Sequence, residues 1–276
     1  MYMIIGMIGA LAAVAIGLFL YMVWTSGRPV LTKPAFRLAR LDPSFDGTKL
    51  VFISDLHRRK LTGAVIEALR QEEPELVLIG GDLTERGVPL DRVKANIGLL
   101  QQIAPVYAVM GNHDYDTDYR KLHIMLDELG ARTLSNEAVM LEKGAGRLWL
   151  VGVDDPVTGK DRLDMAFADV PFDRQCCLLL AHDPTIALRL APYRADLVLS
   201  GHTHGGQVCL PGIGALYTAT KRQYRYFSAG RFALGSMGPH PADLFISRGY
   251  GTSTLPIRFF CPAEYHVVTL LGADER

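Results

Sequence analysis

Seven residues of the types that bind metal ions follow five short apolar runs of this sequence. They are Asp55, His57, Asp82, Asn112, His182, His202 and His204. The runs consist mainly of Val, Ile and Leu, as do strands that are buried on both faces of a sheet. Because ligands of open α/β sheets bind beyond the carboxyl ends of the strands, we expect the seven side chains to converge at one site.

The spacing within two of these groups supports convergence. The motifs D-L-H at 55–57 and H-T-H at 202–204 each separate their metal-binding residues by a single position. In an extended backbone, side chains two positions apart point to the same side. Glycines beside the motifs let the backbone approach closely without a Cβ clash. Each pair is therefore predicted to form one corner of a shared site.

The donor set indicates which ions would bind. Two carboxylates, one amide oxygen and four imidazoles exceed the four ligands of a tetrahedral zinc site. If one aspartate bridged two divalent ions, both could be held, and the net positive charge left at the site would suit a phosphate group. No cysteine is among the donors, and mixed nitrogen and oxygen ligands suit manganese, with iron and zinc as alternatives. We expect two divalent metal ions.

The motifs also resemble those of a known family. The order D-x-H, G-D, G-N-H-D, H and G-H-T-H between residues 50 and 210 resembles the calcineurin-like metallophosphoesterases. The resemblance implies an α/β fold, a sandwich of two mixed β-sheets flanked by helices. It implies that four residues hold one metal ion: Asp55, His57, Asp82 and His204. Asp82 would bridge to a second ion held by three further residues: Asn112, His182 and His202.

Asp82 and His113 are the predicted catalytic residues. The resemblance implies that the histidine after the asparagine faces the substrate and donates a hydrogen bond or a proton to the leaving group. A structural turn histidine is the alternative. Glu85 is a candidate to orient His113, and Arg86 to bind phosphate; a solvated pair of charges is the alternative for these two residues.

Three arginines are candidate substrate-binding residues: Arg58, Arg86 and Arg248. Arg58 and Arg59 directly follow the first motif, where they would bind substrate phosphate or line the rim of the site. Arg248, in the motif S-R-G, would contact phosphate or pair with an internal acid. Both alternatives stay open for each residue.

The C-terminal part of the chain narrows the resemblance to one branch of the family. Residues 201–212 and 247–270 resemble the membrane-anchored bacterial members, which include the UDP-2,3-diacylglucosamine pyrophosphatases of lipid A synthesis. This resemblance implies hydrolysis of a phosphodiester or pyrophosphate bond in a lipid-linked or nucleotide-linked envelope precursor. The alternatives are a general phosphodiesterase or phosphomonoesterase and a protein phosphatase of the cell envelope. An inactive scaffold is disfavoured because all seven ligands are present.

The first 24 residues contain no charged side chain and form the predicted transmembrane anchor. As a helix they would be about 36 Å long, enough to cross a hydrocarbon core of about 30 Å. No basic residue precedes the run, which distinguishes it from a cleavable signal peptide. Four basic residues follow it: Arg28, Lys33, Arg37 and Arg40. By the positive-inside rule we expect a single-pass protein of the inner membrane whose catalytic domain faces the cytoplasm.

Residues 25–48, which include three prolines, are predicted to be an extended connector, and residues 49–276 the phosphoesterase domain. On this interpretation a form of the protein that begins near Leu41 keeps its metal ions. In the first part of the domain, apolar runs alternate with amphipathic helical patterns, which indicates a largely parallel sheet. Residues 207–271 contain strand-like runs and turn signals and are expected to supply a second, antiparallel-rich sheet.

Composition limits the partners. The 29 basic side chains balance the 29 acidic ones, so the charge gives no general attraction to nucleic acid. A phosphate-containing substrate, which can be lipid-linked, and a membrane are the expected partners, and the oligomeric state is left open. The basic and aromatic run at 221–232 is a candidate for contact with a membrane surface or for an ordinary amphipathic strand. His240 is a loop residue that could face the site.

Overall fold

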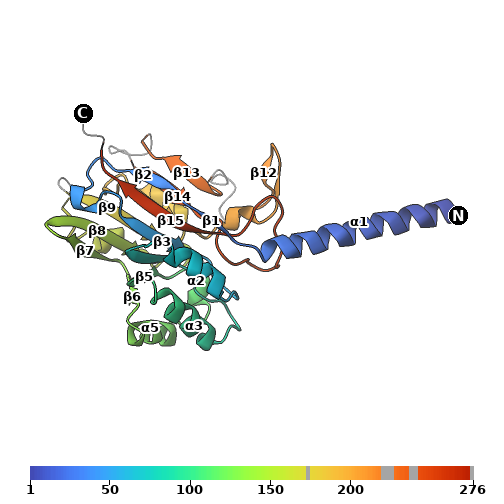
Figure 1. The fold of residues 1–276 in the computed structure, drawn as a ribbon, viewed down its shortest axis with the longest axis horizontal. Helices are drawn as coiled ribbons and strands as arrows, with labels where there is room; N and C mark the ends of the chain where they lie inside the picture. Colours follow the sequence, from blue (N-terminus) through green and yellow to red (C-terminus); the bar gives the residue numbers. More distant parts are fainter. Residues whose placement is uncertain (172–174, 219–226, 236–241, 274–276) are drawn as a thin grey trace.

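Two β-sheets packed face to face form the centre of the domain (Figure 1). The computed structural model describes residues 1–171, 175–218, 227–235 and 242–273. Residues 221–226 of the basic and aromatic run, and also His240, lie outside the described residues.

The first sheet has the strand order β1-β15-β3-β4-β5-β6, with β2 paired to the C-terminal end of β15. Its strands are β1 (Val30–Thr32), β2 (Ala35–Arg37), β3 (Lys49–Ile53), β4 (Leu76–Gly80), β5 (Val106–Val109), β6 (Arg132–Thr133) and β15 (Glu264–Leu271). β3 to β6 run parallel to one another, whereas β15 runs antiparallel to β3. The last strand of the chain therefore completes a sheet built from the N-terminal half.

The second sheet is mixed rather than antiparallel-rich. Its strands, in order, are β13 (Gly230–Ala233), β14 (Asp243–Ile246), β10 (Leu197–Ser200), β9 (Cys176–Ala181), β8 (Gly146–Val153) and β7 (Glu137–Lys143). The inner strands are parallel, and only the edge strands β13 and β7 are antiparallel to their neighbours. The prediction for residues 207–271 was therefore wrong, because strand-like runs do not reveal which distant strand they pair with.

Helices cover the outer faces of both sheets. On the first sheet lie α2 (Gly63–Arg70), α3 (Leu90–Leu100) and α5 (Tyr119–Glu128), and on the second lie α6 (Leu163–Ala166) and the 3₁₀ helix η2 (Pro184–Arg189). Figure 1 shows α2, α3 and α5 together on the first sheet. Shorter elements are α4 (Asn112–Tyr115), η1 (Pro43–Phe45), η3 (His204–Gly206) and the hairpin of β11 (Cys209–Leu210) and β12 (Gly214–Ala215). This architecture confirms the predicted sandwich of two mixed sheets flanked by helices.

The apolar layer between the sheets holds the strand ends in place. Phe52 and Leu78 of the first sheet meet Leu180 and Leu199 of the second, and all four side chains are fully buried. Every residue of β4, β9 and β10 is buried, which explains the continuous rather than alternating apolar pattern of these strands. Burial of apolar surface stabilises the folded state by roughly 25 cal/mol per Å². The buried strands are therefore held firmly, and the loops that follow them start from rigid positions.

A long apolar helix, α1 (Tyr2–Ser26), projects from the domain (Figure 1). It is long and apolar enough to cross a membrane, and its side chains are exposed over nearly its whole length. Its C-terminal end is hydrogen-bonded to residues 253–261, which we call the anchor loop. The hydroxyls of Thr25 and Ser26 donate to carbonyl oxygens of this loop, those of Arg258 and Pro256. The loop therefore fixes the direction of α1 at the domain surface.

Residues 25–48, predicted as a connector, contain two strands of the first sheet. β1 and β2 both pair with β15. Phe36 of β2 is fully buried in the layer between the sheets, where its ring packs edge-on against Phe245. Strands of three residues are not recognised from the sequence, because an alternation of apolar and polar residues over three positions contains only one or two apolar side chains.

Removing these strands is expected to destabilise the domain. A soluble form that begins at Leu41 lacks β1, β2 and Phe36, whereas a form that begins at Arg28 keeps all three. Because loss of a buried phenylalanine side chain costs about 3–5 kcal/mol, the shorter form should melt roughly 10 °C lower. Thermal unfolding followed by circular dichroism measures the difference. Equal melting temperatures would show that the two strands do not stabilise the domain.

Candidate metal centre

Five loops meet where strands of both sheets end, and they bring the seven predicted ligands together. Asp55, Asp82 and Asn112 follow β3, β4 and β5 of the first sheet. His182 and His202 follow β9 and β10 of the second. The convergence at the carboxyl ends of the strands, expected from the sequence, is what the structure shows.

One half of the cluster contains Asp55, His57 and His204. The Nε2 atoms of the two histidines lie 3.0 Å apart. The Oδ1 of Asp55 lies 3.5 Å from the Nε2 of His204. All three side chains are buried, and their donor atoms lie within 4.8 Å of one another, close enough to share one metal ion.

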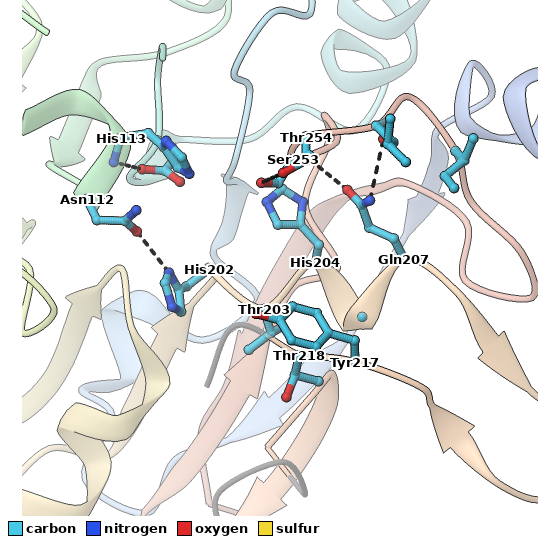
Figure 2. Close-up of a pocket in the computed structure, with 14 residues that line it drawn as sticks. Asn112, His113, His202, Thr203, His204, Gln207, Tyr217, Thr218, Ser253 and Thr254 are labelled. Atoms are coloured by element: carbon cyan, nitrogen blue, oxygen red, sulfur yellow. Dashed lines mark hydrogen bonds between the residues drawn. The ribbon is translucent and has the colours of Figure 1, made fainter. Parts of the chain in front are cut away.

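The other half contains Asn112, His182 and His202. The Oδ1 of Asn112 lies 3.2 Å from the Nε2 of His182 and 3.0 Å from the Nδ1 of His202 (Figure 2). The two imidazole nitrogens are 3.2 Å apart. The Nδ1 of His182 donates to the carbonyl oxygen of Gly80 at 2.8 Å, which leaves its Nε2 as a lone-pair donor facing the centre.

Asp82 lies between the two halves. Its Oδ2 is 3.5 Å from the Nε2 of His57 and 3.3 Å from the Nε2 of His182. Its Oδ1 accepts a hydrogen bond from the backbone N–H of His113 at 2.9 Å. One carboxylate in contact with both halves has the position that a bridging ligand requires.

The cluster fits divalent metal ions. Asp55 and Asp82 are almost completely buried, and among the described residues neither forms an ion pair with a lysine or arginine. Buried carboxylates need compensating positive charge. The buried Nδ1 of His204 has no hydrogen-bond partner in the described part of the chain. Nitrogen and oxygen donors in this arrangement suit manganese, iron or zinc.

The opposite charges packed into the cluster also shift the pKa values of Asp82 and His57. Burial acts to raise the pKa of Asp82, but the charge and hydrogen bond of His182, with the charge of His57, outweigh burial and lower it. Burial acts to lower the pKa of His57, yet the close carboxylate of Glu85 and the charges of Asp82 and Asp55 raise it. The carboxylates thus raise the pKa of His57 and of His182, whereas burial lowers the pKa of His202 and of His204. The same negative field stabilises bound divalent cations.

Five of the seven predicted ligands have left-handed backbone conformations, with φ between 48° and 70°: Asp55, His57, Asp82, His202 and His204. Such angles are uncommon outside glycine and cost roughly 1 kcal/mol or more each. The extended backbone assumed for the two D-x-H and H-x-H motifs was therefore wrong, since both lie on tight turns. The surrounding hydrogen bonds hold these turns, for example from the N–H of His202 to the carboxylate of Asp55.

Glycines beside the cluster leave room for its carboxylates. A Cβ added at Gly201 would overlap the carboxylate of Asp55, and a Cβ added at Gly111 would overlap that of Asp82. Neither glycine has a positive φ. Close approach, rather than backbone freedom, is therefore the reason for glycine at these two positions.

Glu85 contacts one histidine of the cluster. Its Oε2 lies 3.1 Å from the Nδ1 of His57, and its Oε1 pairs with Arg58. The sequence left Glu85 either as a candidate to orient His113 or as part of a solvated pair of charges. The structure shows neither, because its buried carboxylate contacts His57. A carboxylate this close to the ring raises the pKa of His57.

His113 lies beside the cluster and lines the cavity in front of it (Figure 2). Its ring centroid is 5.0 Å from that of His57, with the rings edge to face. Its Nδ1 lies 3.6 Å from a carboxylate oxygen of Asp116, and 33% of its side chain is exposed. This histidine is therefore accessible from the cavity, unlike the fully buried His57 and His182.

The three predicted substrate-binding arginines are not among the described residues that line this cavity. Arg58 pairs with Glu85, and Arg86 is exposed to solvent. Arg248 pairs with Glu264 at 2.9 Å, which is the internal ion pair that the sequence left as an alternative. Their roles in substrate binding stay predictions.

Sequence analysis missed Arg258, whose side chain is fully buried beside the cluster. Its guanidinium donates to the carbonyl oxygens of His204, Arg248 and Gly251. Burial lowers the pKa of Arg258 to about 10. This arginine ties the H-T-H turn at 202–204 to the anchor loop. In the sequence Arg258 stands within L-P-I-R-F-F. An exposed arginine could stand in the same sequence, so nothing there indicates that this one is buried.

Residues 48–206 match the calcineurin-like phosphoesterase family. The chain belongs to this family. It is 35% identical over 228 residues to the uncharacterised protein YpbG of Bacillus subtilis, with 82% of each chain covered. It is 28% identical to the phosphodiesterase YaeI of Escherichia coli, over 85% of this chain and 86% of that one. Family membership and the cluster together identify a metal-dependent phosphoric ester hydrolase.

A solved structure shares the fold. The 5′-nucleotidase precursor of Thermus thermophilus superimposes with a TM-score of 0.53 and 16% identity, over 81% of this chain and 54% of that chain. At this identity the similarity concerns the fold alone, and it agrees with the two-sheet sandwich described above.

The glycine at 201 offers a test of the cluster's geometry. Gly201→Ala should displace the carboxylate of Asp55 and lower the bound metal per chain by at least about half, while the apolar core keeps the domain folded. Gly98→Ala is the matched control, since an added Cβ on α3 meets no atom within 4 Å. Elemental analysis and circular dichroism provide the two measurements. Full metal content in Gly201→Ala would contradict the placement of Asp55 as a ligand.

Proposed function

We propose that this family member hydrolyses a phosphodiester or pyrophosphate bond of a lipid-linked substrate at the membrane surface, using two divalent ions held by the seven-residue cluster. An envelope precursor that is lipid-linked or nucleotide-linked fits this description, and UDP-2,3-diacylglucosamine is the specific compound to test first. The observation that carries the proposal is the lining of the cavity at the metal centre.

This cavity has a volume of about 350 Å³ and joins polar and apolar walls. The polar wall includes Asp82, Asn112 and His113, next to the cluster histidines. The apolar wall is made by side chains of the β12 region and the anchor loop: Tyr217, Leu255 and Ile257. The volume accommodates a phosphate and part of its substituents. A substrate with an apolar group close to its phosphate would contact both walls.

The apolar wall is continuous with the attachment of α1. Leu255 and Ile257 alternate in the anchor loop with Pro256 and Arg258, whose carbonyl oxygens bind the end of α1. The same loop is hydrogen-bonded to β11 through the carbonyl oxygen of Phe259. Figure 1 shows the β12 hairpin on the side of the domain from which α1 projects.

Exposed apolar side chains surround this part of the surface: Ile213, Leu216, Tyr217, Leu255 and Phe260. Clusters of exposed apolar residues commonly mark contacts with membranes or partners. With α1 embedded in a bilayer, these side chains would face its surface, and an acylated substrate could reach the cavity without leaving the membrane.

We place α1 as a single span of the inner membrane, with the domain on the cytoplasmic side. The support is the positive-inside rule, because four basic residues follow α1: Arg28, Lys33, Arg37 and Arg40. On this topology the substrate lies in the cytoplasmic leaflet.

The chemistry is divided between bound ions and the chain. Bound divalent ions would neutralise the phosphate oxygens and activate water for in-line attack. His113 lines the cavity, and the hydrogen bond from its backbone N–H to Asp82 holds its main chain next to the cluster. We assign it the transfer of a proton to the leaving oxygen, a role that histidine commonly performs.

His113→Ala should leave two metal ions bound and lower kcat by roughly 10²–10⁴ for a substrate with a poor leaving group. The loss should be smaller for p-nitrophenyl esters, whose leaving group needs no proton. His123→Ala is the matched control, because that histidine is exposed on α5 and pairs with Asp127. Steady-state kinetics and elemental analysis measure both effects. Loss of metal in His113→Ala would instead make His113 a ligand.

The reaction class is tested with full-length protein in phospholipid nanodiscs and added Mn²⁺, Zn²⁺ or Fe²⁺. We expect metal-dependent hydrolysis of bis-p-nitrophenyl phosphate and of UDP-2,3-diacylglucosamine, abolished by a chelator. Activity restricted to p-nitrophenyl phosphate would indicate a phosphomonoesterase. Activity restricted to a phosphopeptide would indicate a protein phosphatase.

The apolar rim predicts a difference between soluble and membrane-bound substrates. The double variant Ile213→Ser/Phe260→Ser changes exposed side chains that do not line the cavity. It should hydrolyse the soluble diester as the wild type does, but the acylated substrate in nanodiscs at least about tenfold more slowly. Ile124→Ser/Val157→Ser, at equally exposed positions elsewhere, is the control. Equal rates of both variants on the acylated substrate would contradict the proposed entry from the bilayer.

A further inference from the structure

A second cavity lies at the foot of α1 and is separate from the metal centre. It has a volume of about 630 Å³. Its lining comes from the residues that follow α1, the loop before α2, the first turn of α2 and the side chains of Tyr250 and Tyr265. None of its lining residues also lines the metal cavity.

The lining is strongly cationic. It contains three basic side chains: Arg28, Arg59 and Lys60. No acidic side chain is among the described residues that line it. Lys60 is exposed, and in the described part of the chain it forms no ion pair. The first turn of α2 adds the partial positive charge of a helix N-terminus. A cavity with this charge favours an anion.

The arginines are tied to the end of α1. The guanidinium of Arg28 stacks over the ring of Trp24, with 3.9 Å between its Cζ and the ring centroid. Arg59 donates to the carbonyl oxygen of Ser26 and lies over the ring of Tyr250. Arg59 therefore turns away from the metal centre, although it follows the first metal-binding motif by only two residues.

The length of α1 determines where this cavity lies relative to a bilayer that α1 spans. Its 25 residues give about 37 Å of helix, against a hydrocarbon core of about 30 Å. Tyr21 and Trp24 occupy the last turns, where aromatic side chains prefer the membrane interface. The cavity begins directly after this point, with Gly27 and Arg28. It therefore lies at the level of the lipid phosphate groups when α1 spans the bilayer.

We propose that this cavity binds the phosphate of an anionic phospholipid headgroup. Cationic residues next to a membrane segment commonly bind such lipids. The inference rests on the proposed membrane location of α1 and not on the phosphoesterase activity. Because residues 58–60 continue directly from the D-L-H motif, a bound headgroup would also hold that loop against the foot of α1.

The test uses full-length protein in detergent micelles with equal amounts of phosphatidylglycerol and phosphatidylcholine, and counts bound lipids by native mass spectrometry. Wild type should retain phosphatidylglycerol preferentially. Arg28→Gln/Lys60→Gln should bind it at least about tenfold more weakly. Lys94→Gln/Arg120→Gln removes the same charge from exposed positions on α3 and α5 and should behave as wild type.

Further measurements distinguish a failure of this proposal from a failure of the proposed function. Arg28→Gln/Lys60→Gln should keep the melting temperature and the soluble diesterase rate of wild type, because neither residue lines the metal cavity. Equal retention of the two lipids by wild type, or unchanged retention by this variant, would overturn the proposal. Displacement of the lipid by inorganic phosphate at equal concentration would identify free phosphate as the ligand instead. If the protein bound lipid but hydrolysed no ester, the proposed function alone would fail.

Discussion

The burial of two carboxylates beside four imidazoles is the constraint on which the rest of the structure depends. Asp55 and Asp82 are shielded from water, and no lysine or arginine in the described part of the chain pairs with them. Such an arrangement is unfavourable unless positive charge is supplied. Divalent ions would supply it, and the strained turns and close glycines of the loops bring the donor atoms together. The stability of the apolar sandwich offsets the cost of these turns.

The anchor loop connects this centre to α1, the candidate membrane span. One part of the loop lines the cavity, and its carbonyl oxygens hold the end of α1. Arg258 completes the connection, since its buried guanidinium binds carbonyl oxygens of both the His204 turn and the chain before the loop. The position of the candidate metal centre relative to α1 is therefore set by a few hydrogen bonds rather than by a flexible tether. This arrangement supports a substrate that is presented at the membrane.

Two surfaces flank the foot of α1, and they differ in character. The apolar rim of the metal cavity includes Ile213 and Phe260, whereas the second cavity carries Arg28 and Lys60. The two surfaces fit the proposed membrane location of α1, because apolar side chains enter a membrane interface and cations bind its phosphates. Neither surface could be recognised in the sequence, because Lys60 and Phe260 are brought near α1 by the fold and lie far apart in the chain.

The sequence by itself determined the fold class, the family and the set of residues around the metal centre. All three depend on local features of the sequence. Buried strands appear as continuous apolar runs, and each run is followed by a residue able to bind metal. Only the tertiary structure decided that Glu85 contacts His57, that Arg248 pairs with Glu264, and that the supposed connector forms β1 and β2. It also revealed the buried role of Arg258. The physical reason is that contacts between distant segments depend on packing, which leaves no periodic pattern in the chain.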